Sequence, residues 1–377
     1  MSKMPEFKIG NFTTRLPIIQ GGMGVGISGI RLALAVAAED ALPTIATVEM
    51  GKDDPRWQKG RTKDIANADA LRAAIEEFRK KRPGKTLQVN IMVAQTNYPE
   101  TVAIASDKEH GADIIACGSA LPTTLPELVS EGSRTALVPI VSSAKAARVL
   151  CMKWDRDYSR VPEGIIVEGP KAGGHLGFKD EAEINDPNNA LEKLVPSVIA
   201  KIAPFAEKYG CSIPVIAAGG IYTGEDIYHI MQLGAAGVQL GTRFVTTHEC
   251  DADIKFKQAY IDAKEEDIGL IDSPAGLPGR AIVGGNEFLI RVADGKEKPK
   301  SCGKHCLTKC TWRKSPYCIV DALVAAQEGD LGRGFAFCGI NAYRATEIIS
   351  VHELMTILER EYGEAEEKAN RKAQSLG

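Results

Sequence analysis

The chain has 377 residues, of which 44% are hydrophobic and 25% are charged, and its formal net charge at pH 7 is -3. This is the composition of a globular protein with enough apolar material for a large core. The small net charge and the lack of long Lys/Arg blocks argue against nucleic-acid binding, and no apolar run reaches the ~18 residues that span a bilayer. The first ten residues lack the apolar stretch of a secretory signal, so we expect a cytoplasmic protein.

Short runs rich in Val, Ile and Leu recur along the first two thirds of the chain, with helix-like segments between them. The runs cover residues 16–20, 43–48, 87–93, 112–118, 135–142, 164–169, 213–220 and 237–244. Most are continuously apolar, as is typical of parallel strands that are covered on both faces. Eight strand-then-helix units predict a (β/α)8 TIM barrel. The alternative is an open doubly wound sheet, which usually has fewer strands and a GxGxxG turn after the first.

Helical spacing predicts helices at residues 28–38, 66–80, 144–153 and 224–233, and Ser28 is suited to cap the first of them. The alternation stops after Glu249. Residues 250–345 are rich in Gly, Pro, Asp and Cys and predict a loop-rich extension, and residues 349–372 predict a charged terminal helix. We therefore expect a barrel at 1–260 and a C-terminal extension packed on it at 261–377.

Glycine gathers at the predicted C-terminal ends of the strands, where TIM barrels carry their chemistry. The ends read QGGMG (20–24), GPKAGGHLG (169–177), AAGGI (217–221) and GTR (241–243). Glycine allows a close backbone approach to a ligand and tolerates positive φ. The last two turns would direct backbone N–H groups to one point, which is how barrels hold a phosphate. Two tight turns without a ligand are the alternative.

These motifs resemble those of the nitronate monooxygenases, formerly called 2-nitropropane dioxygenases, and of the related flavin-dependent enoyl-acyl-carrier-protein reductases. The stretches that carry the resemblance are PIIQGGMG (17–24), EGPKAGGHLG (168–177), IPVIAAGGI (213–221), GVQLGTRF (237–244) and SPAGLPGRAI (273–282). The resemblance implies a TIM barrel that binds FMN.

The resemblance also implies where FMN would lie. The glycine-rich turn after the first strand would follow the flavin ring, an asparagine of the third strand would lie near it, and the last two turns would hold the phosphate. The predicted cofactor-binding residues are Gly22, Met23, Gly24, Asn90, Gly173, Gly174, Ala218, Gly219, Gly220, Gly241 and Thr242.

The resemblance matches His175 with the family's active-site histidine in AGGH. Imidazole titrates near pH ~6.5, so it can take a proton from a carbon acid or give one to a carbanion. A structural histidine is the alternative, but the glycine-rich setting at a strand end favours a catalytic role. Lys171 stands where the family commonly has a glutamate, and this departure bears on substrate choice.

Four of the nine cysteines are clustered near the C-terminus, with His305 among them. In a chain without an export signal, such a cluster favours metal binding or redox chemistry over disulfides. Thiolates suit a [4Fe–4S] cluster, or zinc if His305 replaces one of them; free thiols in a loop are the alternative. We expect a metal centre, iron–sulfur before zinc, at Cys302, Cys306, Cys310 and Cys318.

Three functions remain open. A nitronate monooxygenase would oxidise nitronates through FMN with O2, and His175 would generate or orient the anion. An ene reductase would use NAD(P)H to reduce FMN and pass a hydride to the β-carbon of an enoyl thioester. A non-catalytic flavin-binding module is the third. We expect an FMN-dependent oxidoreductase of the nitronate monooxygenase type that acts on a small molecule, and a homodimer stays open.

Overall fold

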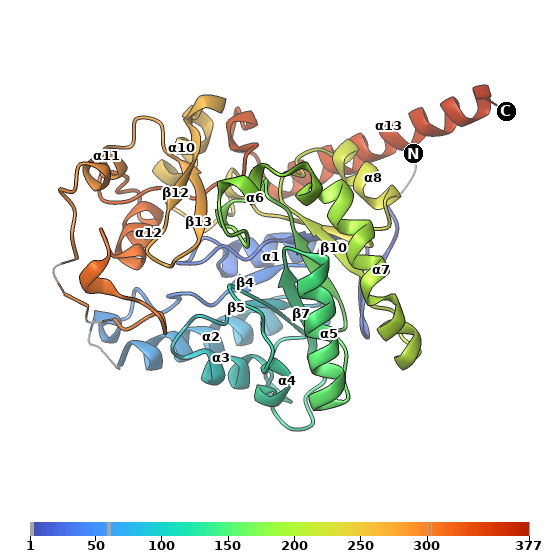
Figure 1. Ribbon diagram of the computed structural model, residues 1–377, viewed down its shortest axis with the longest axis horizontal. Coiled ribbons are helices and arrows are strands. Elements are labelled where there is room, and N and C mark those ends of the chain that lie inside the picture. Colours follow the sequence, from blue (N-terminus) through green and yellow to red (C-terminus); the bar gives the residue numbers. More distant parts are fainter. Residues whose placement is uncertain (1–3, 59–61, 300, 303, 377) are drawn as a thin grey trace.

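Eight parallel strands form a nearly closed barrel in the computed structural model, which describes residues 4–58, 62–299, 301–302 and 304–376 (Figure 1). The strands are β3 (Ile18–Gln20), β4 (Thr44–Ala46), β5 (Gln88–Met92), β6 (Ile114–Gly118), β7 (Ala136–Val141), β8 (Ile165–Glu168), β10 (Val215–Ala218) and β11 (Gly237–Leu240). All eight lie within the apolar runs that predict strands. β11 pairs with β3 in parallel, and a parallel bridge joins Ile19 of β3 to Leu42, just before β4. The predicted TIM barrel is confirmed.

Side chains alternate between the barrel interior and the surrounding helices, because successive residues of a strand point to opposite faces. Ile166 and Ile216 pack inside the barrel with Phe7. Their neighbours Ile165 and Val215 pack on the outer side with residues of the helices. Phe7 belongs to an antiparallel hairpin made of β1 (Phe7–Ile9) and β2 (Phe12–Thr14). A Cβ on the first residue of β11 would lie 3.2 Å from the Phe7 ring, so the hairpin covers the N-terminal end of the barrel.

Helices cover the outside of the barrel and make up much of the C-terminal third (Figure 1). They are α1 (Ile30–Ala38), α2 (Thr62–Lys81), α3 (Tyr98–Ala105), α4 (Leu125–Leu128), α5 (Ala144–Tyr158), α6 (Glu181–Asn185), α7 (Leu191–Tyr209), α8 (Gly224–Gln232), α9 (Thr242–Val245), α10 (Ile254–Asp262), α11 (Glu287–Ala293), α12 (Ile319–Gln327) and α13 (Val351–Leu376). Short 3-10 turns occur at Pro55–Gln58, Pro187–Asn189, Glu265–Asp267, Trp312–Lys314 and Ala342–Arg344. The four helices predicted from spacing are present, and α2 and α5 are longer than predicted.

Helix α1 is not capped by Ser28, so this prediction is wrong. The Asp251 carboxylate accepts hydrogen bonds from the backbone N–H groups of Arg31 and Leu32 at 3.2 and 3.0 Å. The residue before the helix is Gly29, where a Cβ would lie 2.7 Å from the Asp251 carboxyl carbon. Asp251 is 220 positions from Arg31 in the chain. A capping rule that considers only neighbouring residues cannot find such a partner.

The predicted loop-rich extension at residues 250–345, here called the C-terminal lobe, has a sheet and helices (Figure 1). Strands β12 (Ile268–Asp272) and β13 (Pro278–Ile282) form an antiparallel hairpin. β13 also pairs with β9 (Gly174–His175), which lies in the loop after β8. The lobe is therefore joined through backbone pairing to one of the glycine-rich strand ends of the barrel.

The terminal helix is confirmed as α13 and packs on the barrel helix α8. The Tyr362 ring lies edge-on to Tyr228 with ring centroids 5.5 Å apart. A Cβ on Gly224 would lie 2.2 Å from the Leu358 carbonyl oxygen, so only glycine permits this approach. The C-terminal end of α13 projects beyond the barrel (Figure 1).

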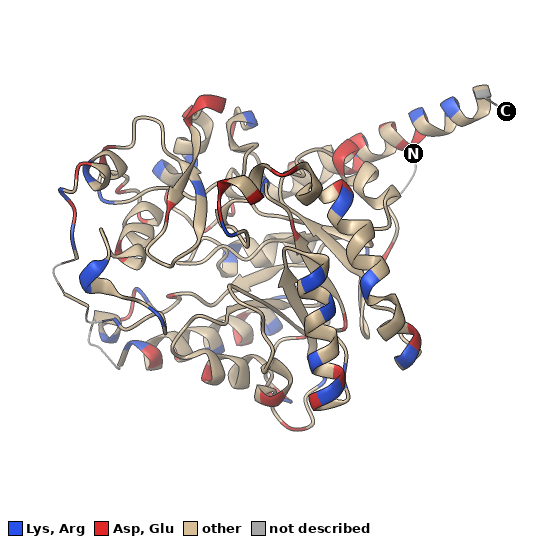
Figure 2. Ribbon diagram, in the orientation of Figure 1, with Lys and Arg blue, Asp and Glu red and all other residues tan. Residues whose placement is uncertain are grey.

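Lys and Arg positions and Asp and Glu positions both occur along the outer helices (Figure 2). Positions of both signs are spread along the chain in that view, which agrees with the small net charge. In the part of the chain that the structure describes, no helix combines the length and apolarity that a membrane span needs.

Candidate active site at the C-terminal ends of the strands

The turn after β3 is held by a buried network of polar groups. The Gln20 side-chain amide donates to the Gly21 carbonyl at 2.5 Å and to the Ser28 hydroxyl at 2.7 Å, and its oxygen accepts from the Thr44 N–H at 3.0 Å. The Ser28 hydroxyl donates to the Gly21 carbonyl at 2.8 Å and accepts from the Met23 N–H at 2.9 Å. Ser28 therefore shapes this turn instead of capping α1.

The structure brings together several residues that are predicted to lie along the flavin ring. A Cβ on Gly22 would lie 2.4 Å from the Asn90 side chain, so these two residues are in direct contact. The Met23 sulfur lies 3.7 Å from the position that a Cβ on Gly241 would occupy. A Cβ on Gly24 would lie 3.0 Å from a valine of the loop after β4. The ends of β3, β5 and β11 therefore meet at one place.

Three polar side chains face the barrel interior near its C-terminal end. Strand alternation places Asn90, Glu168 and Gln239 on the inner face, and each is half-buried. Burial raises the pKa of the Glu168 carboxyl to about 7. The side-chain oxygen of Gln239 is buried and has no hydrogen-bond partner among the described residues. Our sequence analysis did not identify Glu168 or Gln239, although each is a polar residue in an otherwise apolar strand.

His175 lies in β9, above the end of β8. Its Nε2 atom is 2.6 Å from the Ser273 hydroxyl, and its ring lies edge-on to Phe337 with ring centroids 4.9 Å apart. Burial lowers the pKa of His175 to about 4, so its imidazole is neutral at pH 7. The register pairs His175 with Gly279 and Gly174 with Arg280. A neutral, half-buried imidazole with a hydroxyl partner can accept a proton.

Arg280 fixes the glycine-rich loop that leads to His175. Its guanidinium is buried and donates to the carbonyl oxygens of Pro170 and Ala172 at 2.5 and 2.8 Å. Burial lowers the pKa of Arg280 from its ordinary value. These two carbonyl groups would otherwise be buried without a donor. The sequence analysis did not predict this role. An arginine in the otherwise apolar strand β13 is the one feature that could have indicated it.

The turns after β10 and β11 have free backbone donors. Gly219 and Gly220 adopt positive φ values of 97° and 82°, which a residue with a Cβ rarely adopts. Among the described residues, no acceptor pairs with the N–H groups of Gly219, Gly220, Gly241 or Thr242. Free N–H groups on two neighbouring turns fit a phosphate group. The residues present therefore suit the phosphate end of FMN.

A segment of the C-terminal lobe lies over these two turns. The N–H of Gly339 donates to the Thr242 hydroxyl at 3.0 Å, and the Asn341 amide donates to the Gly220 carbonyl at 2.7 Å. A Cβ on Gly173 would lie 2.4 Å from the carbonyl carbon of the residue before Gly339. Sequence reasoning did not include this segment, because more than 90 residues separate it from the turns it contacts.

The four clustered cysteines lie on a segment that pairs with the loop after β5. The Cys306 carbonyl accepts from the Thr96 N–H at 3.2 Å, and a neighbouring bridge joins Gln95 to Leu307. Cys306 is buried, and burial raises its thiol pKa to about 12. In the described residues, which omit 300 and 303 of this stretch, no three His, Cys, Asp or Glu side chains gather in a metal-binding arrangement. The metal centre stays a prediction.

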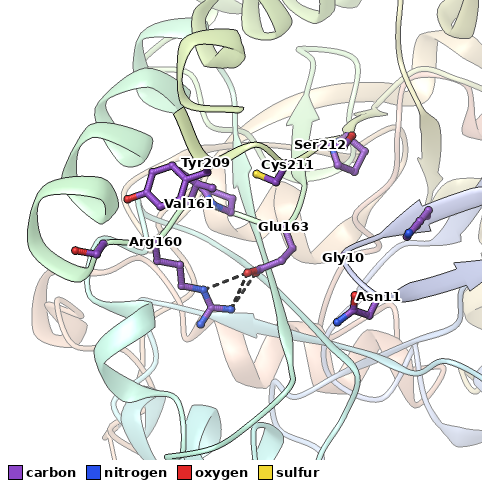
Figure 3. Close-up of a pocket in the computed structure, with 12 residues that line it drawn as sticks. Gly10, Asn11, Arg160, Val161, Glu163, Tyr209, Cys211 and Ser212 are labelled. Atoms are coloured by element: carbon purple, nitrogen blue, oxygen red, sulfur yellow. Dashed lines mark hydrogen bonds and ion pairs between the residues drawn. The ribbon is translucent and has the colours of Figure 1, made fainter. Parts of the chain in front are cut away.

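A cavity of about 470 Å³ lies at the opposite end of the barrel (Figure 3). It is lined by the turn of the β1–β2 hairpin and by the segments that precede β8 and β10. An ion pair between Arg160 and Glu163, with atoms 3.0 Å apart, stands at its wall. TIM barrels carry their chemistry at the other face, so this cavity is not part of the candidate active site.

Comparisons with known proteins agree on one family. A sequence profile of the nitronate monooxygenase family matches residues 5–361. A probable nitronate monooxygenase from Staphylococcus saprophyticus is 38% identical over 129 residues, which cover 34% of this chain and 33% of that protein. The chain therefore aligns with about a third of the length of this curated relative.

Two further relatives match over most of the chain. A (3aS,4S,5R,7aS)-5-hydroxy-7a-methyl-1-oxo-octahydro-1H-indene-4-carboxyl-CoA dehydrogenase from Mycobacterium tuberculosis is 28% identical over 304 residues, which cover 79% of this chain and 73% of that protein. Among solved structures, FabK from Thermotoga maritima has a TM-score of 0.71 at 25% identity, covering 95% of this chain and 96% of that chain.

The chain has the TIM-barrel fold, the class of fold to which FMN-dependent oxidoreductases belong. Within that class, the chain belongs to the nitronate monooxygenase family.

Proposed function

We propose that this protein is an FMN-dependent oxidoreductase that oxidises nitronates with O2. The observation that carries the proposal is a neutral imidazole, His175, in the glycine-rich loop whose Ala172 packs against Gly219, one of the turn residues whose free N–H groups fit a phosphate. Family membership and the glycine-rich strand ends support FMN as the cofactor.

The chain's own residues bind and orient the reactants. Bound FMN would supply one- and two-electron transfer. Gly219, Gly220, Gly241 and Thr242 would hold its phosphate, and the contact between Gly22 and Asn90 would lie beside the ring. His175 accepts the proton from the carbon next to the nitro group, or orients the anion already formed.

Reduction of an enoyl thioester by NAD(P)H is the second candidate function. It is favoured by the likeness to FabK and to the carboxyl-CoA dehydrogenase, each over most of the chain. In this reaction a residue must protonate the α-carbon. His175 is a poor donor at pH 7 because its pKa is lowered to about 4, whereas Glu168 with a pKa of about 7 could donate. In the reductase reaction, Glu168 and not His175 is therefore the expected proton donor to the α-carbon.

Two assays on one preparation separate these functions. Oxygen consumption with the anion of a simple nitroalkane, without NAD(P)H, should proceed if the first proposal is right. Oxidation of NADH or NADPH that depends on an added enoyl-CoA, measured without oxygen, would support the reductase instead. Activity in neither assay, with flavin bound, would support the non-catalytic module.

The cysteine cluster is proposed as a separate metal centre, iron–sulfur before zinc. Its support is the sequence clustering alone, together with the softness of thiolate ligands. Iron, sulfide and zinc analysis of anaerobically purified protein tests it. Fewer than about 0.2 metal equivalents per chain would contradict it.

A further inference from the structure

We propose that Lys171, Arg243 and Arg344 form a cationic set that binds the cofactor phosphate, so that charge on these three residues makes the site select FMN over an uncharged flavin. This inference rests on the proposed binding of FMN. Lys171 and Arg243 lie within the sequence motifs and Arg344 lies outside them, but neither the motifs nor the comparisons assign any of the three to the phosphate.

Lys171 lies directly against the predicted phosphate turn. If Gly220 had a Cβ, that atom would lie 2.7 Å from Cβ and 3.0 Å from Cδ of Lys171. The lysine stem therefore crosses Gly220, and its exposed ammonium has no ion-pair partner among the described residues. Its backbone is fixed, because the Lys171 carbonyl accepts from the Ile340 N–H at 3.2 Å.

The two arginines meet at one aromatic ring beside the same turns. The guanidinium carbons of Arg243 and Arg344 each lie 4.5 Å from the centre of the Tyr222 ring. Arg243 directly follows Thr242, and Tyr222 comes two residues after Gly220. Such stacking holds a guanidinium in place without neutralising it. The Nε atom of Arg243 is buried and has no hydrogen-bond partner among the described residues.

Two carboxylates at the start of α8 are engaged with backbone N–H groups. Asp226 accepts from the N–H groups of Tyr222 and Thr223, both at 2.9 Å. Glu361 accepts from the N–H of Gly224 at 2.8 Å. Within the described ranges, neither carboxylate pairs with any of the three cations.

An anionic ligand would resolve this arrangement. Three cations that pair with no carboxylate lie beside four free N–H groups. The like charges repel one another, and a bound anion would offset that repulsion. A terminal phosphate brings two negative charges and accepts several hydrogen bonds. Riboflavin has the same ring and ribityl chain but no phosphate, so it should gain nothing from the cations.

The test compares FMN and riboflavin binding to the apoprotein by quenching of flavin fluorescence. Lys171→Glu should weaken FMN binding by ~10-fold or more, because a charge-assisted contact becomes a repulsion. Riboflavin affinity should stay within about twofold of the wild type. Lys171→Gln and Arg344→Gln, which remove charge without reversing it, should shift FMN affinity in the same direction but less.

Lys179→Glu is the matched control, because Lys179 is exposed in the same loop and the change in net charge is equal. It should leave both affinities unchanged. Circular dichroism of each variant identifies any that fail to fold, and Lys171→Gln then replaces Lys171→Glu as the deciding variant.

Unchanged FMN affinity in the Lys171 and Arg344 variants would overturn the inference. An equal loss for FMN and riboflavin would overturn it as well, because it would report damage to the loop instead of loss of charge. If the wild-type apoprotein binds neither flavin, the proposed function fails first, and that outcome is visible before any variant is made.

Discussion

At the scale of single residues, His175 is the proposed proton acceptor. Its Nε2 atom is 2.6 Å from Ser273, and burial keeps the imidazole neutral at pH 7. We expect His175→Ala to retain bound flavin and to lose about 10²–10⁴-fold in turnover, the usual contribution of a positioned proton acceptor. Steady-state oxygen consumption measures the loss. A variant that turns over nitronate at the wild-type rate would reduce His175 to a structural residue.

Titration of the Glu168 carboxyl should change the reaction rate near neutral pH. Its pKa is raised to about 7, so the carboxyl is protonated below pH 7 and negatively charged above it. The negative charge should repel an anionic nitronate at the inner mouth of the barrel. We therefore expect kcat/KM for the nitronate to fall as pH rises above about 7, and Glu168→Gln to abolish that fall. An unaltered pH profile in the variant would remove Glu168 from the site.

Protonation of His175 should not change the rate in the same pH range. Because its pKa is lowered to about 4, it stays neutral and able to accept a proton throughout the neutral range. Loss of rate from its protonation should begin only as the pH falls toward 4.

Gly220 tests the phosphate turn by steric means. Its φ is 82°, and a side chain there would also collide with Lys171. Gly220→Leu should give colourless protein that does not take up FMN. Gly84→Leu is the control, since Gly84 has a φ of 76° but no atom within 4 Å of its Cβ position. Full flavin content in the Gly220 variant would show that the phosphate binds elsewhere.

At the scale of elements, Arg280 of β13 holds the loop after β8, so its loss should lower both the stability of the protein and its affinity for FMN. Arg280→Met would leave the buried carbonyls of Pro170 and Ala172 without donors. We expect a loss of ~1–3 kcal/mol in the free energy of unfolding, measured with urea, and weaker FMN binding. Arg291→Met is the control, because Arg291 donates to the Gly332 carbonyl away from the site. If Arg280→Met binds FMN as tightly as the wild type, Arg280 stabilises the lobe but does not shape the cofactor site.

The barrel could be predicted from sequence because its signal is local. Each strand is a short apolar run, and burial on both faces makes the run continuous. The pairing of β9 with β13 gives no such signal. β9 has two residues, one of them glycine, and the His175–Ser273 contact joins positions 98 apart. Separations of 220 and 121 positions likewise hide the role of Asp251 at α1 and of Asn341 at the Gly220 turn.

The candidate site was predictable to a similar extent. The glycine turns and His175 follow recognisable motifs, and the structure places them at the ends of neighbouring strands. Arg280, Glu168 and Arg243 lie within the motifs that carry the resemblance, but the motifs do not show their roles, and Arg344 lies outside them. Their roles come from burial and from partners supplied by other elements, which only the folded chain defines.

At the scale of the whole molecule, both proposed enzymatic functions require that the barrel binds a flavin at the C-terminal ends of its strands. The most direct measurement is the anaerobic ultraviolet–visible spectrum of the purified protein, followed by chromatography of the released cofactor. We predict flavin absorption bands and one FMN per chain, with further broad absorbance near ~400 nm that dithionite bleaches if the cysteines hold an iron–sulfur cluster. Colourless protein that does not bind added FMN would contradict the claim.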